Sequence, residues 1–211
     1  MTAALACLGL GFLAGAVPFG LFIGRLARGV DVRRHGSGNL GATNVLRVAG
    51  PGWGLLALAL DMGKGWFAAA LLPLMLGALP RLAIPAGSGS PAPLLGALGA
   101  VAGHIFTPAA RFRGGKGVAT ALGAWLALDP LAALLGVALF ALAFALLRFV
   151  SVGSQAMVTT FPAATLLGGR VDPLGWAAAL GCLFALLVAW RHGANWRRLV
   201  RGEEPRLGRR R

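Results

Sequence analysis

The first 24 residues of the chain contain no charged side chain, and long apolar runs recur after them. A transmembrane helix needs about 20 predominantly apolar residues. With 57% hydrophobic and 12% charged residues, this 211-residue chain is too apolar for a soluble domain. Apolar segments lie near 3–24, 53–79, 93–109, 118–128, 131–147, 154–168 and 174–190. We therefore expect an all-α, polytopic integral membrane bundle of seven transmembrane helices, folded as a single domain over residues 1–211.

The basic residues indicate the orientation of these helices, because loops that stay in the cytoplasm accumulate Lys and Arg. With the N-terminus outside and the C-terminus in the cytoplasm, the outer loops contain only Arg81 and Arg170. A five-span arrangement, which fuses 118–147 and makes 154–190 one crossing, also keeps the arginine-rich tail inside and remains the alternative. No basic residue precedes the first apolar run, so we expect a retained span and not a cleaved signal.

Polar residues gather in the inner loops of this topology. Four stretches contain most of them: RRHGSGNLGATNVLR, RFRGGKGVAT, RFVSVGS and RHGANWRRLVRGEE. The outer loops consist of turn-forming residues. Function is therefore expected at the cytoplasmic face of the membrane.

The stretch HGSGNLGATNVLR is dense in small hydrogen-bonding groups. Asn39 is a candidate helix cap, and a helix that starts near Gly41 would place Thr43, Asn44 and Arg47 on one face. We expect these residues to bind substrate, although a capped connector with Arg47 at lipid headgroups would have the same pattern.

The second stretch contains a glycine loop, which consists of Gly114, Gly115, Lys116 and Gly117. The loop immediately precedes an apolar run, so its backbone N–H groups should lie at a helix N-terminus, which favours an anion. Glycines let a phosphate approach the backbone, and lysine adds a compact charge with three donors. We expect phosphate binding here; a flexible basic turn is the alternative.

Asp61, Lys64 and His104 fall inside predicted spans. Charged groups in membrane helices usually face a partner or a polar cavity. Lys64 either pairs with Asp61, one helical turn away, or contributes with His104 to the substrate site. His104 lies on the span that precedes the glycine loop and is expected on the same side as the loop.

The last stretch follows the final span. His192, Asn195 and Arg198 are spaced by three residues and would form a polar stripe if the helix continues. We take His192 and Asn195 as catalytic candidates, with Ser37 as a nucleophile, a phosphate ligand or a turn residue. Ser151, from the stretch RFVSVGS, completes the expected substrate-binding set.

Composition excludes several classes of function. The chain has only six acidic residues and no clustered aspartates, so we expect no metal and no other cofactor. Its basic residues lie between hydrophobic spans without aromatic interleaving, which argues against nucleic acid. Two classes remain: a transferase that acts on phosphorylated substrates beside lipid, or a carrier or channel for an anionic phosphorylated solute.

Three ordered motifs favour the transferase. SGNLGATNVLR, GHIF with RFRGGKGVAT, and RHGANWRRLVRGEE together resemble the cytoplasmic signatures of the bacterial acyl-phosphate:glycerol-3-phosphate acyltransferases, and AVPFG and DMGKG fit the same pattern. The resemblance runs from about Pro18 to Glu203. Thr107 departs from it, since the family more often has proline there, and Trp196 replaces a more usual aliphatic residue.

The resemblance implies transfer of a fatty acyl group from acyl phosphate to the 1-hydroxyl of glycerol 3-phosphate, which gives lysophosphatidic acid and phosphate. It implies a multi-pass protein of the bacterial plasma membrane that depends on an enzyme producing long-chain acyl phosphate. Since an acyl phosphate is already activated, we expect direct attack by the glycerol hydroxyl, with His192 or a substrate phosphate accepting the proton.

Overall fold

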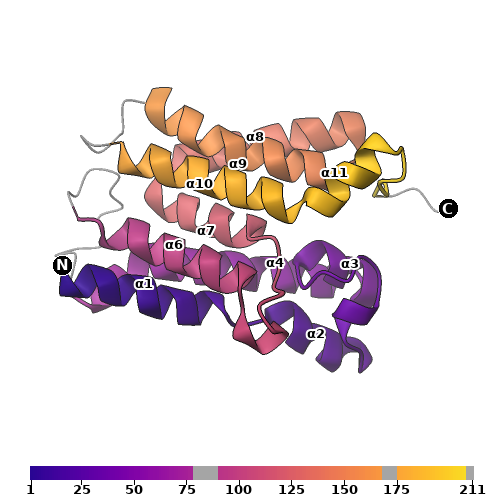
Figure 1. The fold of residues 1–211 in the computed structure, drawn as a ribbon, viewed down its shortest axis with the longest axis horizontal. Helices are drawn as coiled ribbons and strands as arrows, with labels where there is room; N and C mark the ends of the chain where they lie inside the picture. The colour runs from indigo at the N-terminus through magenta and orange to yellow at the C-terminus, as the bar shows by residue number, and fades with distance from the viewer. Residues whose placement is uncertain (78–89, 168–174, 208–211) are drawn as a thin grey trace. The chain divides into compact units, whose positions relative to one another are not determined.

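The computed structural model describes residues 1–77, 90–167 and 175–207. Within these ranges the chain is helical and contains no strand, which confirms the all-α class (Figure 1). The described residues fall into two compact units, the first comprising 1–77 and 90–128 and the second 129–167 and 175–207. The single-domain organisation stays a prediction, and each unit is described by itself below.

The first unit contains seven α-helices within its described residues, with short helical turns between them. α4 continues through a wider turn, η2, into α5 and forms one long apolar segment. The helices are α1 (Thr2–Gly15), α2 (Phe19–Arg28), α3 (Ala42–Ala49), α4 (Pro51–Trp66), α5 (Leu72–Met75), α6 (Ala92–Ile105) and α7 (Val118–Leu128), and the turns are η1 (Val32–Arg34), η2 (Phe67–Leu71) and η3 (Pro108–Ala110).

Small residues let α1 and α6 pack side by side, as the indigo and magenta ribbons of Figure 1 show. A methyl group added at Gly99 or Gly103 would collide with the backbone of Leu8 or Phe12. Helices that associate in membranes use such small residues to bring their backbones together. This close packing fixes the end of α6, which carries His104.

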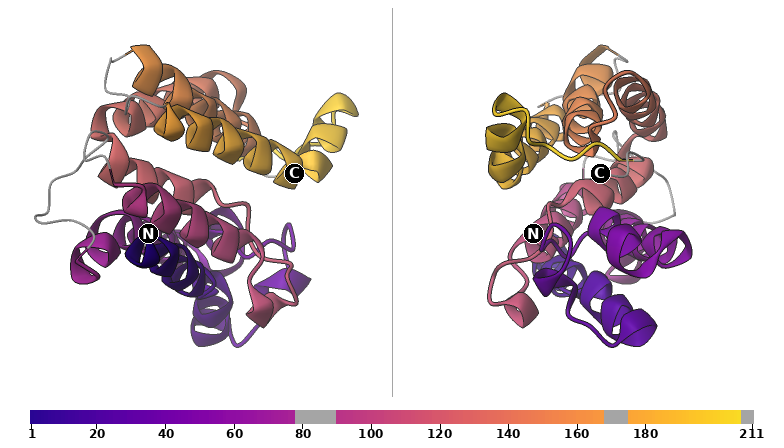
Figure 2. Two further views of the ribbon diagram at one scale, coloured as in Figure 1. Left: turned by 60° about the vertical axis from the view of Figure 1, so that its left-hand side comes forward. Right: turned by 90° about the vertical axis from the view of Figure 1, so that its right-hand side faces the viewer.

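The second unit is built from α8 (Pro130–Leu147), α9 (Val150–Leu167), α10 (Trp176–Arg191) and α11 (Gly193–Val200). Asp129 caps α8, since its Oδ1 accepts from the Ala132 N–H at 3.0 Å, and its Oδ2 accepts from Thr165 Oγ1 on α9 at 3.3 Å. A 59° bend at His192 separates α10 from α11 and is visible at the yellow end of the chain in Figures 1 and 2.

All seven predicted apolar segments contain helices in the described residues. Among the residues that the structure describes, four helical segments are long and apolar enough to cross a membrane, or five if the bent pair α10–α11 is one span. They are Thr2–Arg28, Pro51–Met75, Ala92–Ala110 and Pro130–Leu147. α7 has only 11 residues, as the sequence indicates. These candidate spans agree with the predicted helical membrane bundle, while the count of seven spans and the orientation of the termini stay predictions.

Candidate functional site

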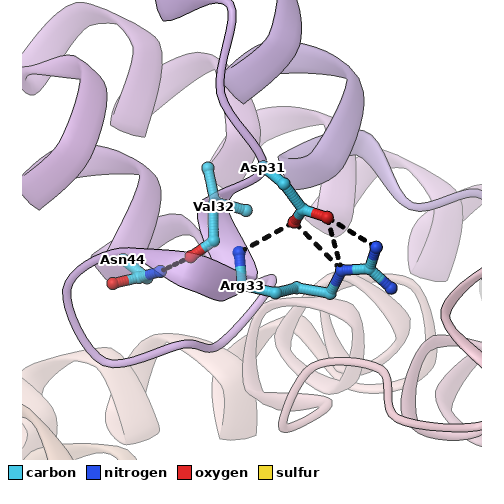
Figure 3. Close-up of polar contacts among 4 residues, drawn as sticks. All are labelled: Asp31, Val32, Arg33 and Asn44. Atoms are coloured by element: carbon cyan, nitrogen blue, oxygen red, sulfur yellow. Dashed lines mark hydrogen bonds and ion pairs between the residues drawn. The ribbon is translucent and has the colours of Figure 1, made fainter.

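The loop between α2 and α3 is organised by the side chain of Asn44 (Figure 3). Its Nδ2 donates to the carbonyl oxygens of Val32, His35 and Asn39 at 2.8, 3.1 and 2.9 Å, and its Oδ1 accepts from the Ser37 N–H at 2.7 Å. Asn44 is 1% exposed. Its amide points inward and holds the loop, and the substrate-binding role expected for Asn44 with Thr43 and Arg47 stays a prediction.

The same loop begins with an ion pair between Asp31 and Arg33 (Figure 3). The Arg33 guanidinium donates to both carboxylate oxygens of Asp31, at 2.6 to 3.0 Å. This hydrogen bonding lowers the pKa of Asp31 to about 2 and raises the pKa of Arg33. Both groups are therefore charged at neutral pH, and they fix the entry to the loop.

Ser37 lies exposed at the tip of this loop, between two glycines with left-handed backbone. Gly36 has φ 59° and Gly38 has φ 71°, values that disfavour other residues. The sequence predicts Asn39 as a helix cap, but in the structure Gly41 is the cap residue of α3. The Oδ1 of Asn39 instead accepts from the Gly41 N–H at 2.8 Å. Asn39 and Gly41 therefore shape the turn that presents Ser37.

Lys64 and Asp61 pair with each other inside the first unit. The distance between Lys64 Nζ and Asp61 Oδ1 is 2.7 Å, and His104 Nδ1 lies 3.4 Å from the same oxygen. Lys64 Nζ also donates to the carbonyl of Val17 at 3.1 Å. This ion pair is one of the two alternatives that the sequence left open for Lys64, whose side chain is 5% exposed.

The glycine loop lies directly on His104, as the sequence predicts. The N–H groups of Gly115 and Gly114 donate to the carbonyls of His104 and Ile105, at 3.1 and 3.0 Å. Both N–H groups are therefore used within the protein in this structure, and their expected binding of phosphate stays a prediction. Gly117 precedes α7 with φ 83°, so the loop does open a helix, and Lys116 is partly exposed.

A small cavity of about 10 Å³ lies beside this cluster, with Asp61, Lys64, His104, Thr107 and Gly115 among its lining residues. That volume is on the scale of one water molecule, so the cavity is too small to hold a substrate.

In the second unit, Glu204 joins three other polar residues. Its Oε1 accepts from Asn195 Nδ2 at 2.6 Å and from Ser151 Oγ at 3.0 Å, and its Oε2 accepts from Arg198 Nε at 2.9 Å. The Glu204 side chain is 5% exposed. Sequence reasoning missed Glu204, although an acidic residue that follows a strongly basic helix is a usable signal.

His192 lies at the bend between α10 and α11 and is 1% exposed. Its Nδ1 lies 2.8 Å from the Val188 carbonyl, which can only accept, so Nδ1 carries the hydrogen and Nε2 is the basic atom of the neutral ring. The expected straight stripe is interrupted here. Asn195 and Arg198 share one face of α11, and His192 precedes it.

The expected site residues thus form two groups, one in each unit. The first unit contains Ser37, Asn39, Gly41, Thr43, Asn44, Arg47, Lys64, His104, Gly114, Gly115, Lys116 and Gly117, and the second contains Ser151, His192 and Asn195.

Comparisons with known proteins agree with the motifs. A family model for glycerol-3-phosphate acyltransferase matches residues 5–202. Glycerol-3-phosphate acyltransferase from Anaeromyxobacter sp. (strain Fw109-5) is 42% identical over 198 residues, 93% of each chain. The enzyme of the same name from Myxococcus xanthus (strain DK1622) is 43% identical over 207 residues, covering 98% of this chain and 100% of the relative.

Two solved structures are similar in fold. Both are of PlsY (YgiH), an integral membrane glycerol 3-phosphate acyltransferase, and both are 33% identical to this chain, of which they match 97%. The glycerol 3-phosphate form has a TM-score of 0.85 and is covered to 96%; the lysophosphatidic acid form has a TM-score of 0.83 and is covered to 95%.

Proposed function

Because the chain belongs to the glycerol-3-phosphate acyltransferase family, we propose that it acylates the 1-hydroxyl of glycerol 3-phosphate with acyl phosphate as donor. The products are then lysophosphatidic acid and inorganic phosphate. Membership of the family makes the chain a membrane-embedded glycerol-3-phosphate acyltransferase. The donor, the product and the side of the membrane are the parts proposed here.

The contact between His192 Nδ1 and the Val188 carbonyl is the observation that supports the proposed mechanism. Since Nδ1–H is held on the Val188 carbonyl, Nε2 is the atom able to take a proton. The glycerol oxygen attacks the acyl carbon, a new C–O ester bond forms, the bond from that carbon to the phosphate oxygen breaks, and phosphate leaves. His192 accepts the hydroxyl proton as a general base.

Asn195 assists by orientation. Its Nδ2 donates to Glu204 at 2.6 Å, and this bond sets the orientation of the amide that is proposed to face the glycerol hydroxyl. An acyl phosphate is a mixed anhydride with a good leaving group, so the protein need mainly position the phosphates and stabilise the developing oxyanion. No acyl-enzyme on Ser37 is required.

Exposed donors of the first unit suit the two phosphates. Arg47 is exposed on α3, Thr43 is partly exposed beside it, Ser37 lies at the loop tip, and Lys116 precedes the N-terminus of α7. The headgroups are expected at the cytoplasmic interface of the bacterial plasma membrane, because burying a phosphate in hydrocarbon is prohibitive. A separate enzyme must supply the acyl phosphate.

The test is direct. Purified protein in detergent, given palmitoyl phosphate and glycerol 3-phosphate, should form lysophosphatidic acid and phosphate in equal amounts, and His192→Ala should abolish this. A carrier of anionic solutes would form no product in detergent. Palmitoyl-CoA in place of palmitoyl phosphate is the control for donor class; equal turnover with it would contradict the proposed donor.

A further inference from the structure

Two buried charges, Asp61 and Lys64, have no role in the transfer proposed above. Their side chains are 2% and 5% exposed on a candidate membrane-spanning segment, where inserting a charged group costs free energy. A buried ion pair is often no more stabilising than well-packed apolar side chains. The ion pair between Asp61 and Lys64 is therefore better explained by the groups that it orients than by a gain in stability.

We propose that Asp61, Lys64 and His104 form a positioning network that sets the glycine loop of residues 114–117 for substrate binding, a role that rests on the proposed function. Asp61 Oδ1 faces both Lys64 Nζ, at 2.7 Å, and His104 Nδ1, at 3.4 Å. The carboxylate thereby orients the imidazole ring. These three groups act through the loop and do not touch substrate.

The opposite edge of the ring supports the loop. A methyl group built on Gly115 would collide with His104 Nε2, and its three nearest atoms are all atoms of that ring. The Gly115 N–H also donates to the carbonyl of His104. The orientation of His104 therefore decides where Gly115 lies, and with it the neighbouring Lys116.

The network also reaches the break between α1 and α2. Lys64 Nζ donates to the Val17 carbonyl at 3.1 Å, and Thr107 Oγ1 donates to the Ala16 carbonyl at 2.5 Å. The end of α6, the glycine loop and the α1–α2 break are thus connected through buried hydrogen bonds. This explains how a charged cluster that substrates cannot enter still influences the site.

A double-mutant cycle between positions 104 and 115 tests the proposal. Gly115→Ala should raise the KM for one of the two phosphate substrates by about 10- to 100-fold with less effect on kcat, because the methyl displaces the ring and loop. In a His104→Ala background the methyl has room, so its additional effect on that KM should fall below about threefold.

Gly114→Ala is the matched control. A methyl there would collide with the backbone carbonyls of His104 and Ile105, which no side-chain change at position 104 relieves. Its effect should be the same in both backgrounds. If His104→Ala does not fold, Asp61→Asn combined with Lys64→Met removes both charges together and should raise the same KM while the protein remains folded.

The outcomes separate the two proposals. The network is supported if the wild-type protein is active and the effect of Gly115→Ala on KM falls in the His104→Ala background, while the effect of Gly114→Ala stays the same in both backgrounds. Active wild-type protein in which Gly115→Ala has equal effects in both backgrounds, or a neutral 61/64 variant with both KM values unchanged, overturns the network and leaves the proposed function intact. Wild-type protein that forms no lysophosphatidic acid overturns the proposed function and the positioning role with it.

Discussion

Glu204 is the residue on which three donors of the second unit converge, and each contact is short. Its carboxylate orients Asn195 and neutralises Arg198 from a buried position. We expect Glu204→Gln to lower the free energy of unfolding by about 1 to 3 kcal/mol, because a charge-assisted acceptor is lost, and to lower kcat through a misplaced Asn195. Thermal unfolding and steady-state kinetics measure both effects.

The neighbouring Glu203 provides the control, because it is exposed and the structure places its carboxylate outside this cluster. Glu203→Gln should leave stability and turnover unchanged. Equal behaviour of the two variants would show that the Glu204 contacts do not organise Asn195.

Asp31 gives a prediction for pH. Hydrogen bonds from Arg33 hold its pKa at about 2, below the ordinary value of 3.8. A carboxyl whose folded-state pKa is lowered stabilises the fold above its unfolded pKa and loses that contribution as pH falls through its folded pKa. The melting temperature of Asp31→Asn should therefore lie below that of wild type at neutral pH, and the difference should shrink as pH falls below about 4. A gap that stays constant down to about pH 2 would rule out the ion pair as its cause.

At the scale of elements, the proposed chemistry depends on the N-terminus of α7 and on the bend at His192. The N–H groups of Gly114 and Gly115 donate to carbonyls, so we expect the proposed phosphate binding at α7 to depend on Lys116 and on the first turn of the helix. His192 lies at the 59° bend between α10 and α11, and its Nδ1 contacts the Val188 carbonyl. Asn195 follows on α11.

The α7 terminus predicts a strict requirement for lysine. Lys116→Arg should lower kcat/KM by about 100-fold, roughly 2.7 kcal/mol, because a longer planar head misplaces a tetrahedral phosphate despite conserving charge. Arg113→Lys is the matched change at an exposed position of the same loop and should have far less effect. Near wild-type activity of folded Lys116→Arg would show that the lysine supplies only general positive potential.

At the scale of the whole molecule, the arginine distribution predicts that both loops of the first unit face the cytoplasm. In a Cys182→Ser background, which removes the exposed native thiol, cysteines introduced at His35 and Arg113 should react with an impermeant maleimide only from the cytoplasmic side. A cysteine at Pro91, exposed at the start of α6, should react only from outside. Labelling of positions 35 and 113 from outside would contradict the predicted orientation.

The sequence by itself determined the helical membrane class and the family, because apolar run length and ordered motifs are properties of local sequence. It also placed His104 beside the glycine loop, since both lie at one end of the same segment. Helix starts near Gly41 and Val118 followed from the same local reasoning.

Only the tertiary structure decided which partner each polar group takes. Asn44 turned inward to hold a loop, the Gly114 and Gly115 amides bonded to carbonyls, and Glu204 gathered Ser151, Asn195 and Arg198. The Ser151–Glu204 contact joins residues 53 positions apart, and Lys64–Val17 joins residues 47 apart. A buried polar group must find a partner, but which partner it meets depends on how distant helices pack, and local sequence patterns do not contain that information.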